Sequence, residues 1–166
     1  MKMSIRGAEF TFDGPPKERY SSPRRERSRN MANEMKIELC QISASTSEAT
    51  MGRHKVLIDR PVAKAGSDAG PMGGELFLAA VGGCFMSNLL AAIKAREADI
   101  GDVRVEVVAT LADSPTRFAA VELRVAAERG DRELLERLVE IADRGCIMMN
   151  TLRGKLDVRV LIGAAV

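Results

Sequence analysis

The sequence predicts an α+β fold, and three features of its hydrophobic pattern support this class. Two runs rich in β-forming residues, 102–111 and 118–128, flank a Ser-Pro turn, as in an antiparallel hairpin. Apolar residues fill a long helical stretch from about Glu75 to Ala98, and a second helical pattern covers residues 132–144. The order β-β-α-β-β-α-β contains hairpins rather than repeated βαβ units, which favours an α+β domain.

The first half of the domain is predicted to contain two strands, a loop and the long helix. Residues 36–44 alternate well enough between polar and apolar side chains to predict a strand, with Ile37, Leu39 and Gln41 on one face, and a second strand over 54–61 ends at Pro61. The glycine-rich segment 63–74, "AKAGSDAGPMGG", is expected to be a loop. The helix after it has hardly any polar face, so we expect it to be buried on most sides.

After the hairpin, the sequence indicates one more helix and a final strand. Asp131 is a suitable N-cap for the helix at 132–144, and Gly145 is a suitable C-terminal stop. A short segment, 147–154, then joins the last strand at 155–162. The apolar positions of this helix recur at helical spacing: Leu134, Leu138 and Ile141.

Composition favours one soluble domain. The chain has 166 residues, of which 46% are hydrophobic, enough for a sizeable core. We predict no membrane span, because no apolar run of sufficient length is free of charges and glycines, and the N-terminus has no secretory pattern. Three cysteines, an odd number, argue against a complete disulfide framework, so we expect a cytoplasmic location. The net charge of +2 indicates no class of partner.

Residues 1–34 differ from the rest, with eight Lys and Arg against five Asp and Glu. Few of these residues are aliphatic, so we predict that the segment is mostly disordered and that residues 35–166 form the folded domain. One alternative is a basic arm for nucleic acid, but no interleaved aromatic residues support it. Another is that translation begins at Met31 or Met35, where the regular pattern starts.

Several kinds of chemistry are disfavoured. His54 is the only histidine, so any triad or Cys-His mechanism would depend on it alone. The sequence has no CxxC pair and no zinc-ligand spacing, and its glycine-rich segments match no phosphate-binding or dinucleotide motif. We therefore predict neither a metal nor a cofactor.

The cysteines are the remaining candidates. Cys84 lies in the middle of the long helix after Gly82 and Gly83, each of which weakens a helix by about 1 kcal/mol relative to alanine. These glycines indicate close approach of backbone or substrate, although helical periodicity alone favours ordinary packing. Cys146 follows the end of the second helix, and the two cysteines form a candidate redox couple. Cys40 is interpreted as a packing residue.

A reactive thiolate needs a lowered pKa, which a neighbouring cation can provide. The candidates are Arg53 or Lys55 in "GRHK", with Arg60 as second choice. The alternative is that these are solvated hairpin residues.

Three motifs resemble one known family. "GPMGGELFLAAVGGCFMSNLLAA" is similar to the cysteine-bearing helix of the OsmC/Ohr family, the osmotically inducible and organic hydroperoxide resistance proteins. "CIMMNTLRGKLDVRV" resembles the stretch around that family's second cysteine, and "GRHKVLIDRP" resembles its arginine-bearing hairpin. The resemblance covers about residues 35–163.

The resemblance implies an intertwined homodimer of OsmC-like fold, with antiparallel strands around a long buried central helix. It also implies reduction of organic hydroperoxides, with a lipoyl-type dithiol as reductant and a role in oxidative stress defence. Carried onto this chain, Cys84 would be the peroxidatic nucleophile and Cys146 the resolving cysteine. Arg53 would stabilise the thiolate and orient the peroxide, and Glu75 would hold the arginine.

Helix geometry places a further condition on Glu75. Nine residues at about 1.5 Å and roughly 100° each put Glu75 about 13 Å along the axis from Cys84, on the opposite face. If Glu75 serves an active site, that site is expected to lie between two subunits. The apolar "CIMM" motivates an alternative function, a non-enzymatic dimer that binds a small hydrophobic or lipoyl-like ligand.

Overall fold

The computed structural model describes residues 4–5, 8–9 and 34–163, and the chain divides into two units, 1–35 and 36–166. In the first unit, β1 (Ser4–Ile5) pairs with β2 (Ala8–Glu9) in antiparallel fashion. The predicted disorder of residues 1–34 and the nucleic-acid alternative concern residues that lie mostly outside those described. Both stay predictions.

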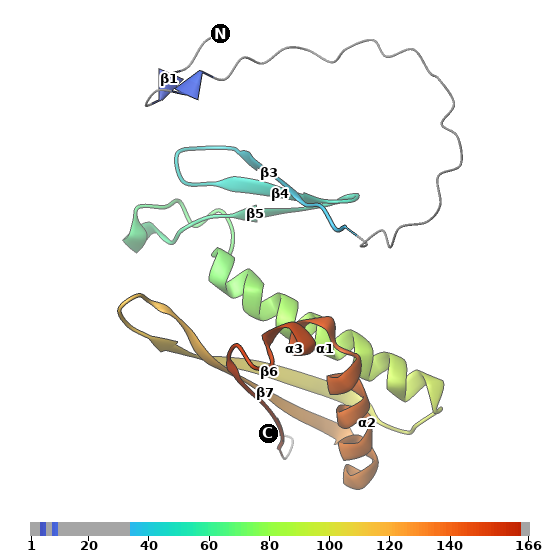
Figure 1. The fold of residues 1–166 in the computed structure, drawn as a ribbon. Coiled ribbons are helices and arrows are strands. Elements are labelled where there is room, and N and C mark those ends of the chain that lie inside the picture. The colour runs from blue at the N-terminus through green and yellow to red at the C-terminus, as the bar shows by residue number, and fades with distance from the viewer. Residues whose placement is uncertain (1–3, 6–7, 10–33, 164–166) are drawn as a thin grey trace, which may run out of the picture. The chain divides into compact units, whose positions relative to one another are not determined.

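The described residues of the second unit form two three-stranded sheets and three α-helices, which can be followed in Figure 1. The strands β3, β4 and β5 form one sheet, and β6, β7 and β8 form the other. The elements of this unit are β3 (Glu38–Gln41), β4 (Ser47–Met51), β5 (His54–Ile58), the 3₁₀ turn η1 (Val62–Lys64), α1 (Gly73–Ala95), β6 (Gly101–Ala112), β7 (Arg117–Arg129), α2 (Arg132–Gly145), α3 (Ile147–Leu152) and β8 (Asp157–Ile162).

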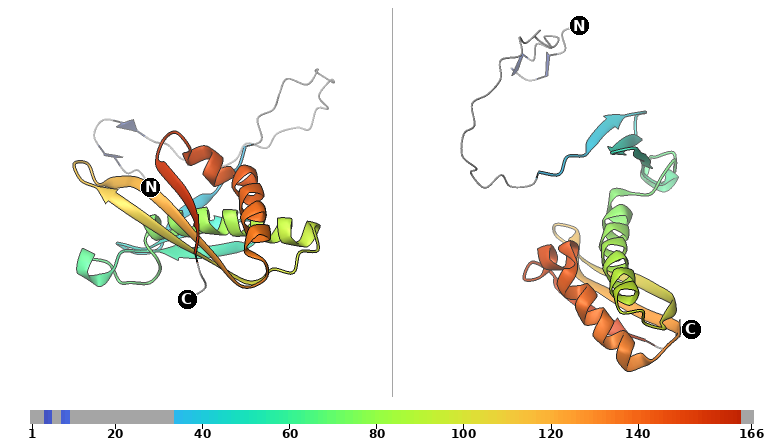
Figure 2. Two further views of the ribbon diagram at one scale, coloured as in Figure 1. Left: turned by 90° about the horizontal axis from the view of Figure 1, so that it is seen from below. Right: turned by 90° about the vertical axis from the view of Figure 1, so that its right-hand side faces the viewer.

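The core lies between the β6–β8 sheet and the helices, which gather on one face of that sheet (Figures 1 and 2). Alternate residues of the strands point into this core, as the period of two requires. Phe77 of α1 stacks on Phe118 of β7, with 5.1 Å between ring centroids. The fully buried side chains at the centre are Val81, Phe85, Leu89, Val121, Leu123, Val125, Leu138, Cys146 and Met149.

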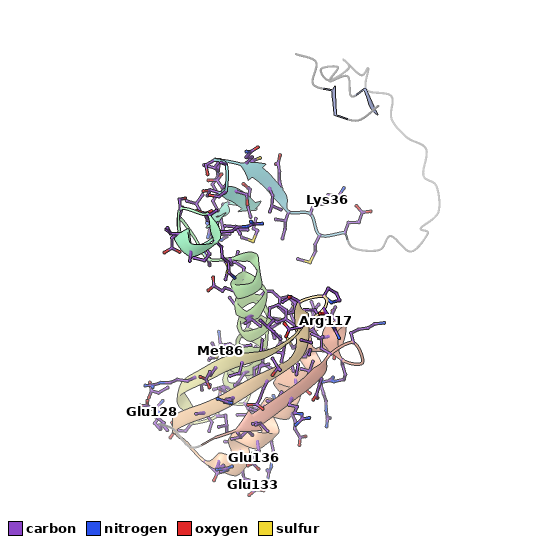
Figure 3. The ribbon with its side chains drawn as sticks, turned by 90° about the vertical axis from the view of Figure 1, so that its left-hand side faces the viewer. Lys36, Met86, Arg117, Glu128, Glu133 and Glu136 are labelled. Carbon is purple, nitrogen blue, oxygen red and sulfur yellow. The ribbon has the colours of Figure 1, made fainter. Side chains whose placement is uncertain are left out.

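The opposite face of the β6–β8 sheet is charged and solvent-exposed. Arg124 of β7 pairs with Glu106 of β6 and with Glu122 of its own strand, and Arg104 pairs with Glu128. Figure 3 shows Glu128 at the end of the sheet and Glu133 and Glu136 on α2. These exposed pairs add little stability, but they keep this face of the sheet in water.

The hairpin of β6 and β7 and the Asp131 cap of α2 were both predicted, and both are confirmed. The carboxylate of Asp131 accepts a hydrogen bond from the backbone N–H of Leu134 at 2.8 Å. The last strand differs from the expected antiparallel arrangement, because β8 runs parallel to β7. The helical connection through α2 and α3 returns the chain to the same end of the sheet, which makes a parallel pairing possible.

The first sheet contains a strand that the sequence did not predict. β4 pairs with β3 on one side and with β5 on the other, although its sequence, "SEATM", has only one β-branched residue. One face of this sheet is apolar, and part of it is exposed: Ile37 is 55% exposed, Leu39 59% and Met51 39%. Within one chain, this face is incompletely covered.

The loop between β5 and α1 is organised around a buried carboxylate. Asp59 is 3% exposed and accepts hydrogen bonds from the backbone N–H groups of Arg60, Ser67 and Ala69 and from the Ser67 hydroxyl. The Ser67 hydroxyl is the largest of the effects that hold the pKa of Asp59 far below its usual value. This network gives the glycine-rich loop a defined path into α1.

The long central helix is confirmed, but the prediction that it is buried on most sides is wrong for a single chain. β6, α2 and α3 pack on one side of α1, and only 28% of its most apolar stretch is buried. By length and composition this helix could cross a bilayer, a property it shares with core helices of soluble proteins. The residues left exposed on its other side are mostly small and apolar: Ala79, Ala80, Gly83, Ser87, Leu90 and Ala91.

Candidate thiol site

The structure brings the two predicted cysteines together. Cys84 lies midway along α1 and is half-buried, whereas Cys146 lies between α2 and α3 and is fully buried. Their Sγ atoms are 3.1 Å apart, with the Cys146 thiol donating to the sulfur of Cys84. Both are free thiols. A disulfide between them therefore requires only a small approach of the two sulfurs.

The corner between α2 and α3 presents Cys146 to α1. α2 ends at Gly145, and Cys146 caps the following helix. Arg153, at the end of α3, donates two hydrogen bonds to the carboxylate of Asp143, at 2.8 and 2.6 Å. Asn150 donates to the carbonyl of Arg144 at 3.0 Å. These contacts fix the two helices around the buried cysteine.

The surroundings of the two sulfurs shift their pKa values in opposite directions. Burial, the largest effect, would raise the pKa of Cys84, but hydrogen bonds from the Met148 backbone, the Cys146 thiol and the Ile147 backbone hold it below its ordinary value. Burial raises the pKa of Cys146, and the neighbouring sulfur of Cys84 raises it further. Cys84 is thus the group that ionises first, and Cys146 stays protonated beside it.

The two glycines before Cys84 have different surroundings. A Cβ at Gly82 would lie 2.7 Å from Cγ2 of Val107 on β6, so a side chain there would force the helix or the valine to shift. A Cβ at Gly83 would meet nothing within 4 Å in this chain. The close approach of the α1 backbone to the β6–β8 sheet therefore explains why a glycine lies at position 82. Gly83 faces outward.

Arg53, Lys55, Arg60 and Glu75 are not part of the immediate surroundings of Cys84. Arg53 is exposed in the turn between β4 and β5, and Lys55 pairs with Glu48 at 2.6 Å. No arginine or lysine contributes to the shifted pKa of Cys84 in the described chain. Glu75 accepts a hydrogen bond from the backbone N–H of Met72 at 2.7 Å, so within one chain it caps α1.

Two features of the site were not predicted from the sequence. The backbone groups of Met148 and Ile147 lower the pKa of Cys84, and both residues belong to the first turn of α3, where N–H groups have no partner within the helix. The side chain of Asn88 lies one turn beyond Cys84 and donates to its carbonyl at 2.9 Å. Its spacing of four residues from Cys84 was the one available signal.

Among the described residues, no group of three or more His, Cys, Asp or Glu side chains is arranged to hold a metal ion. An open apolar groove of about 420 Å³ runs along α1 and β6. By helical geometry it lies on the side of α1 away from Cys84. The groove is lined by Leu78, Ala79, Gly82, Gly83, Met86, Val105 and Val107. Met86 is labelled in Figure 3.

The chain has a pair of free thiols between a long apolar helix and the α2–α3 corner. It also matches a protein-family model. The model described as OsmC-like protein matches residues 66–160, which is more than half of the chain. The chain belongs to the OsmC-like family. The family assignment made from the cysteine motifs is confirmed, and both cysteines lie within the matched region.

Solved structures of OsmC-like proteins share the fold. An OsmC-like protein from Mycoplasma pneumoniae is 16% identical with a TM-score of 0.70, over 82% of this chain and all of the other. An organic hydroperoxide resistance protein from Elizabethkingia anophelis is 20% identical with a TM-score of 0.63, over 81% and 100%. The organic hydroperoxide resistance protein OhrB of Bacillus subtilis is 23% identical with a TM-score of 0.59, over 78% and 98%. No curated protein sequence matches this chain.

Proposed function

We propose that this protein is a thiol-dependent peroxidase that reduces organic hydroperoxides through Cys84 and Cys146. The observation that carries the proposal is the 3.1 Å contact between two free sulfurs whose pKa values are shifted in opposite directions. Membership of the OsmC-like family and neighbours named for organic hydroperoxide resistance support a role in redox or stress defence.

The geometry suits a two-step reaction. The Cys84 thiolate attacks a peroxide oxygen, so an S–O bond forms, the O–O bond breaks, and an alcohol leaves after taking up a proton. The resulting sulfenic acid lies beside the Cys146 thiol. Attack by Cys146 forms the disulfide, breaks the S–O bond and releases water. A dithiol of lipoyl type then reduces the disulfide by exchange.

The roles of Arg53 and Glu75 depend on a second copy of the chain. Neither residue belongs to the surroundings of Cys84 within one chain, and Glu75 lies about two and a half turns away along α1. Single chains also leave exposed the apolar face of the β3–β5 sheet and one side of α1. We infer a homodimer in which the partner's arginine reaches Cys84 and its glutamate holds that arginine.

A second candidate function is binding without catalysis. The groove along α1 and β6 is apolar and has the size of a small-molecule site, which favours a small hydrophobic or lipoyl-like ligand. The groove lies on the opposite side of α1 from Cys84, so its occupant would not contact the reactive sulfur. Under this alternative, the thiol pair would have no part in ligand binding.

Consumption of cumene hydroperoxide with dihydrolipoamide as reductant separates the two candidates. We expect turnover by the wild-type protein and its complete loss in Cys84→Ser. We expect Cys146→Ser to react once and to accumulate the sulfenic acid, which is trapped with dimedone. Cys40→Ser is the matched control, because Cys40 is exposed on β3. A wild-type protein that binds a hydrophobic probe but consumes no hydroperoxide would support the second candidate.

A further inference from the structure

Asn88 is an unusual residue for its place in α1. Between Glu75 and Lys94, only Ser87 and Asn88 have side chains containing oxygen or nitrogen. Ser87 is exposed, whereas Asn88 is half-buried. Asparagine is less favourable than alanine or leucine in a helix interior, because its side chain competes for backbone hydrogen bonds. A partly buried asparagine in this helix therefore calls for a specific contact.

The carboxamide of Asn88 lies between the two backbone segments that hold the cysteines. Its Nδ2 is 2.9 Å from the carbonyl oxygen of Cys84 and 4.0 Å from the sulfur, the outer limit of an N–H···S contact. Its Oδ1 faces Gly145, where a Cβ would approach to 2.8 Å. The amide group thus hydrogen-bonds to the Cys84 turn of α1 and lies beside the residue directly before Cys146.

We propose that Asn88 is a positioning residue for the thiol pair, which holds the sulfur of Cys84 opposite Cys146 and donates an N–H to that sulfur when it is ionised. The Nδ2 of the carboxamide donates to the Cys84 carbonyl, and its second N–H leaves a donor available to the sulfur, which lies at the outer limit of hydrogen-bond distance. A thiolate is a stronger acceptor than a thiol, so this long contact strengthens on ionisation. Gly145 leaves the space that the carboxamide needs.

This inference deepens the proposed function, since it names a residue that supports the same reactive sulfur. Cys146 is the titratable group that faces Cys84 from the α2–α3 corner, and the other groups that lower the pKa of Cys84 are backbone groups of α3. Asn88 belongs to α1 itself, so a substitution of its side chain can alter the ionisation of Cys84 while both cysteines are kept.

The test is a titration of Cys84 in a Cys40→Ser, Cys146→Ser background. It follows the thiolate absorbance and the rate of alkylation by iodoacetamide. Asn88→Leu keeps the size of the side chain and removes both donors. We expect its titration to move to higher pH and its alkylation at neutral pH to slow several-fold. Asn88→Asp should move the titration further, because a carboxylate opposes the thiolate. Ser87→Ala is the matched control and should titrate as the parent does.

Gly145→Ala tests the same geometry from the other side, since its Cβ would displace the carboxamide. It too should move the titration to higher pH, and it serves in place of Asn88→Leu if that variant does not fold. Unchanged titration in the folded Asn88 and Gly145 variants would overturn the proposal. The readout needs no hydroperoxide, so it is independent of the proposed activity. A protein with shifted titrations but no turnover would retain this role for Asn88 and lose the peroxidase function.

Discussion

At the scale of single residues, the Cys146 thiol is predicted to promote ionisation of Cys84. Burial would raise the pKa of Cys84, but the Met148 backbone, the Cys146 thiol and the Ile147 backbone together hold it below the ordinary thiol value. Of these three groups, the Cys146 thiol is the one that a side-chain substitution can remove. Cys146→Ala removes this donor, and the titration of Cys84 should move to higher pH. Alkylation at neutral pH should then slow by about ten-fold, as expected for the loss of one hydrogen bond to a charged group.

Cys146→Ser is the matched control for this prediction, because its hydroxyl retains a donor at the same place. Its titration should lie between those of the wild type and the alanine variant. Both measurements use a Cys40→Ser background, so that the exposed third thiol does not contribute. Equal titrations of the alanine and serine variants would show that the Cys146 donor does not lower the pKa of Cys84.

The site could be predicted from the sequence only in part: the two cysteines were identified, but the backbone groups that lower the pKa of Cys84 were not. The spacing and motifs around Cys84 and Cys146 identified the pair, and the structure places their sulfurs in contact. The donors to Cys84 were not predicted, because residues 147–154 were interpreted only as a short segment that joins the last strand, and no helix was assigned to them. Backbone N–H groups have no signature in the sequence, so only the conformation of this segment reveals them.

At the scale of elements, the contact between α1 and β6 depends on Gly82. Gly82→Ala would place a Cβ 2.7 Å from Cγ2 of Val107, so the helix and sheet must separate or the valine must move. We expect a loss of unfolding free energy of about 1–3 kcal/mol, the usual cost of overpacking. Chemical denaturation at fixed protein concentration measures this change.

The control for Gly82 is a double-mutant cycle with Val107→Ala. That substitution removes the Cγ2 atom and should cost stability by itself, because Val107 packs against the core. In its presence, Gly82→Ala should lose most of its destabilising effect. If the two losses of unfolding free energy are additive, the Cβ of Gly82→Ala does not clash with Val107, and the destabilisation by Gly82→Ala has another origin.

The helices and strands could be predicted from the sequence where the apolar periodicity is strong, but not where pairing with neighbouring strands determines the structure. α1, the β6–β7 hairpin and α2 follow from their apolar patterns and from the Asp131 cap. β4 was missed because "SEATM" has weak β propensity, and it is a strand because it pairs on both edges. The partial exposure of α1 was missed for a related reason. A helix that is apolar all round indicates burial, but it does not say that the covering surface belongs to the same chain.

At the scale of the whole molecule, the proposed dimer predicts that Arg53 serves the Cys84 of the partner subunit. Cys84→Ser and Arg53→Ala are each expected to lose hydroperoxide turnover as homodimers. Heterodimers with one substitution in each chain are obtained by co-expression with two different affinity tags. If Arg53 acts across the interface, one of the two sites keeps both residues intact, and the heterodimer should have about half of the wild-type turnover.

The reciprocal heterodimer makes this test decisive. It pairs a wild-type chain with a chain that carries both substitutions. Across an interface, the only intact cysteine would then face the missing arginine, and turnover should be lost. If Arg53 instead served its own chain, the wild-type subunit would keep a complete site, and this heterodimer would have about half of the wild-type turnover while the first had none. The two heterodimers contain the same substitutions, so the difference between them reports only which subunit supplies the arginine.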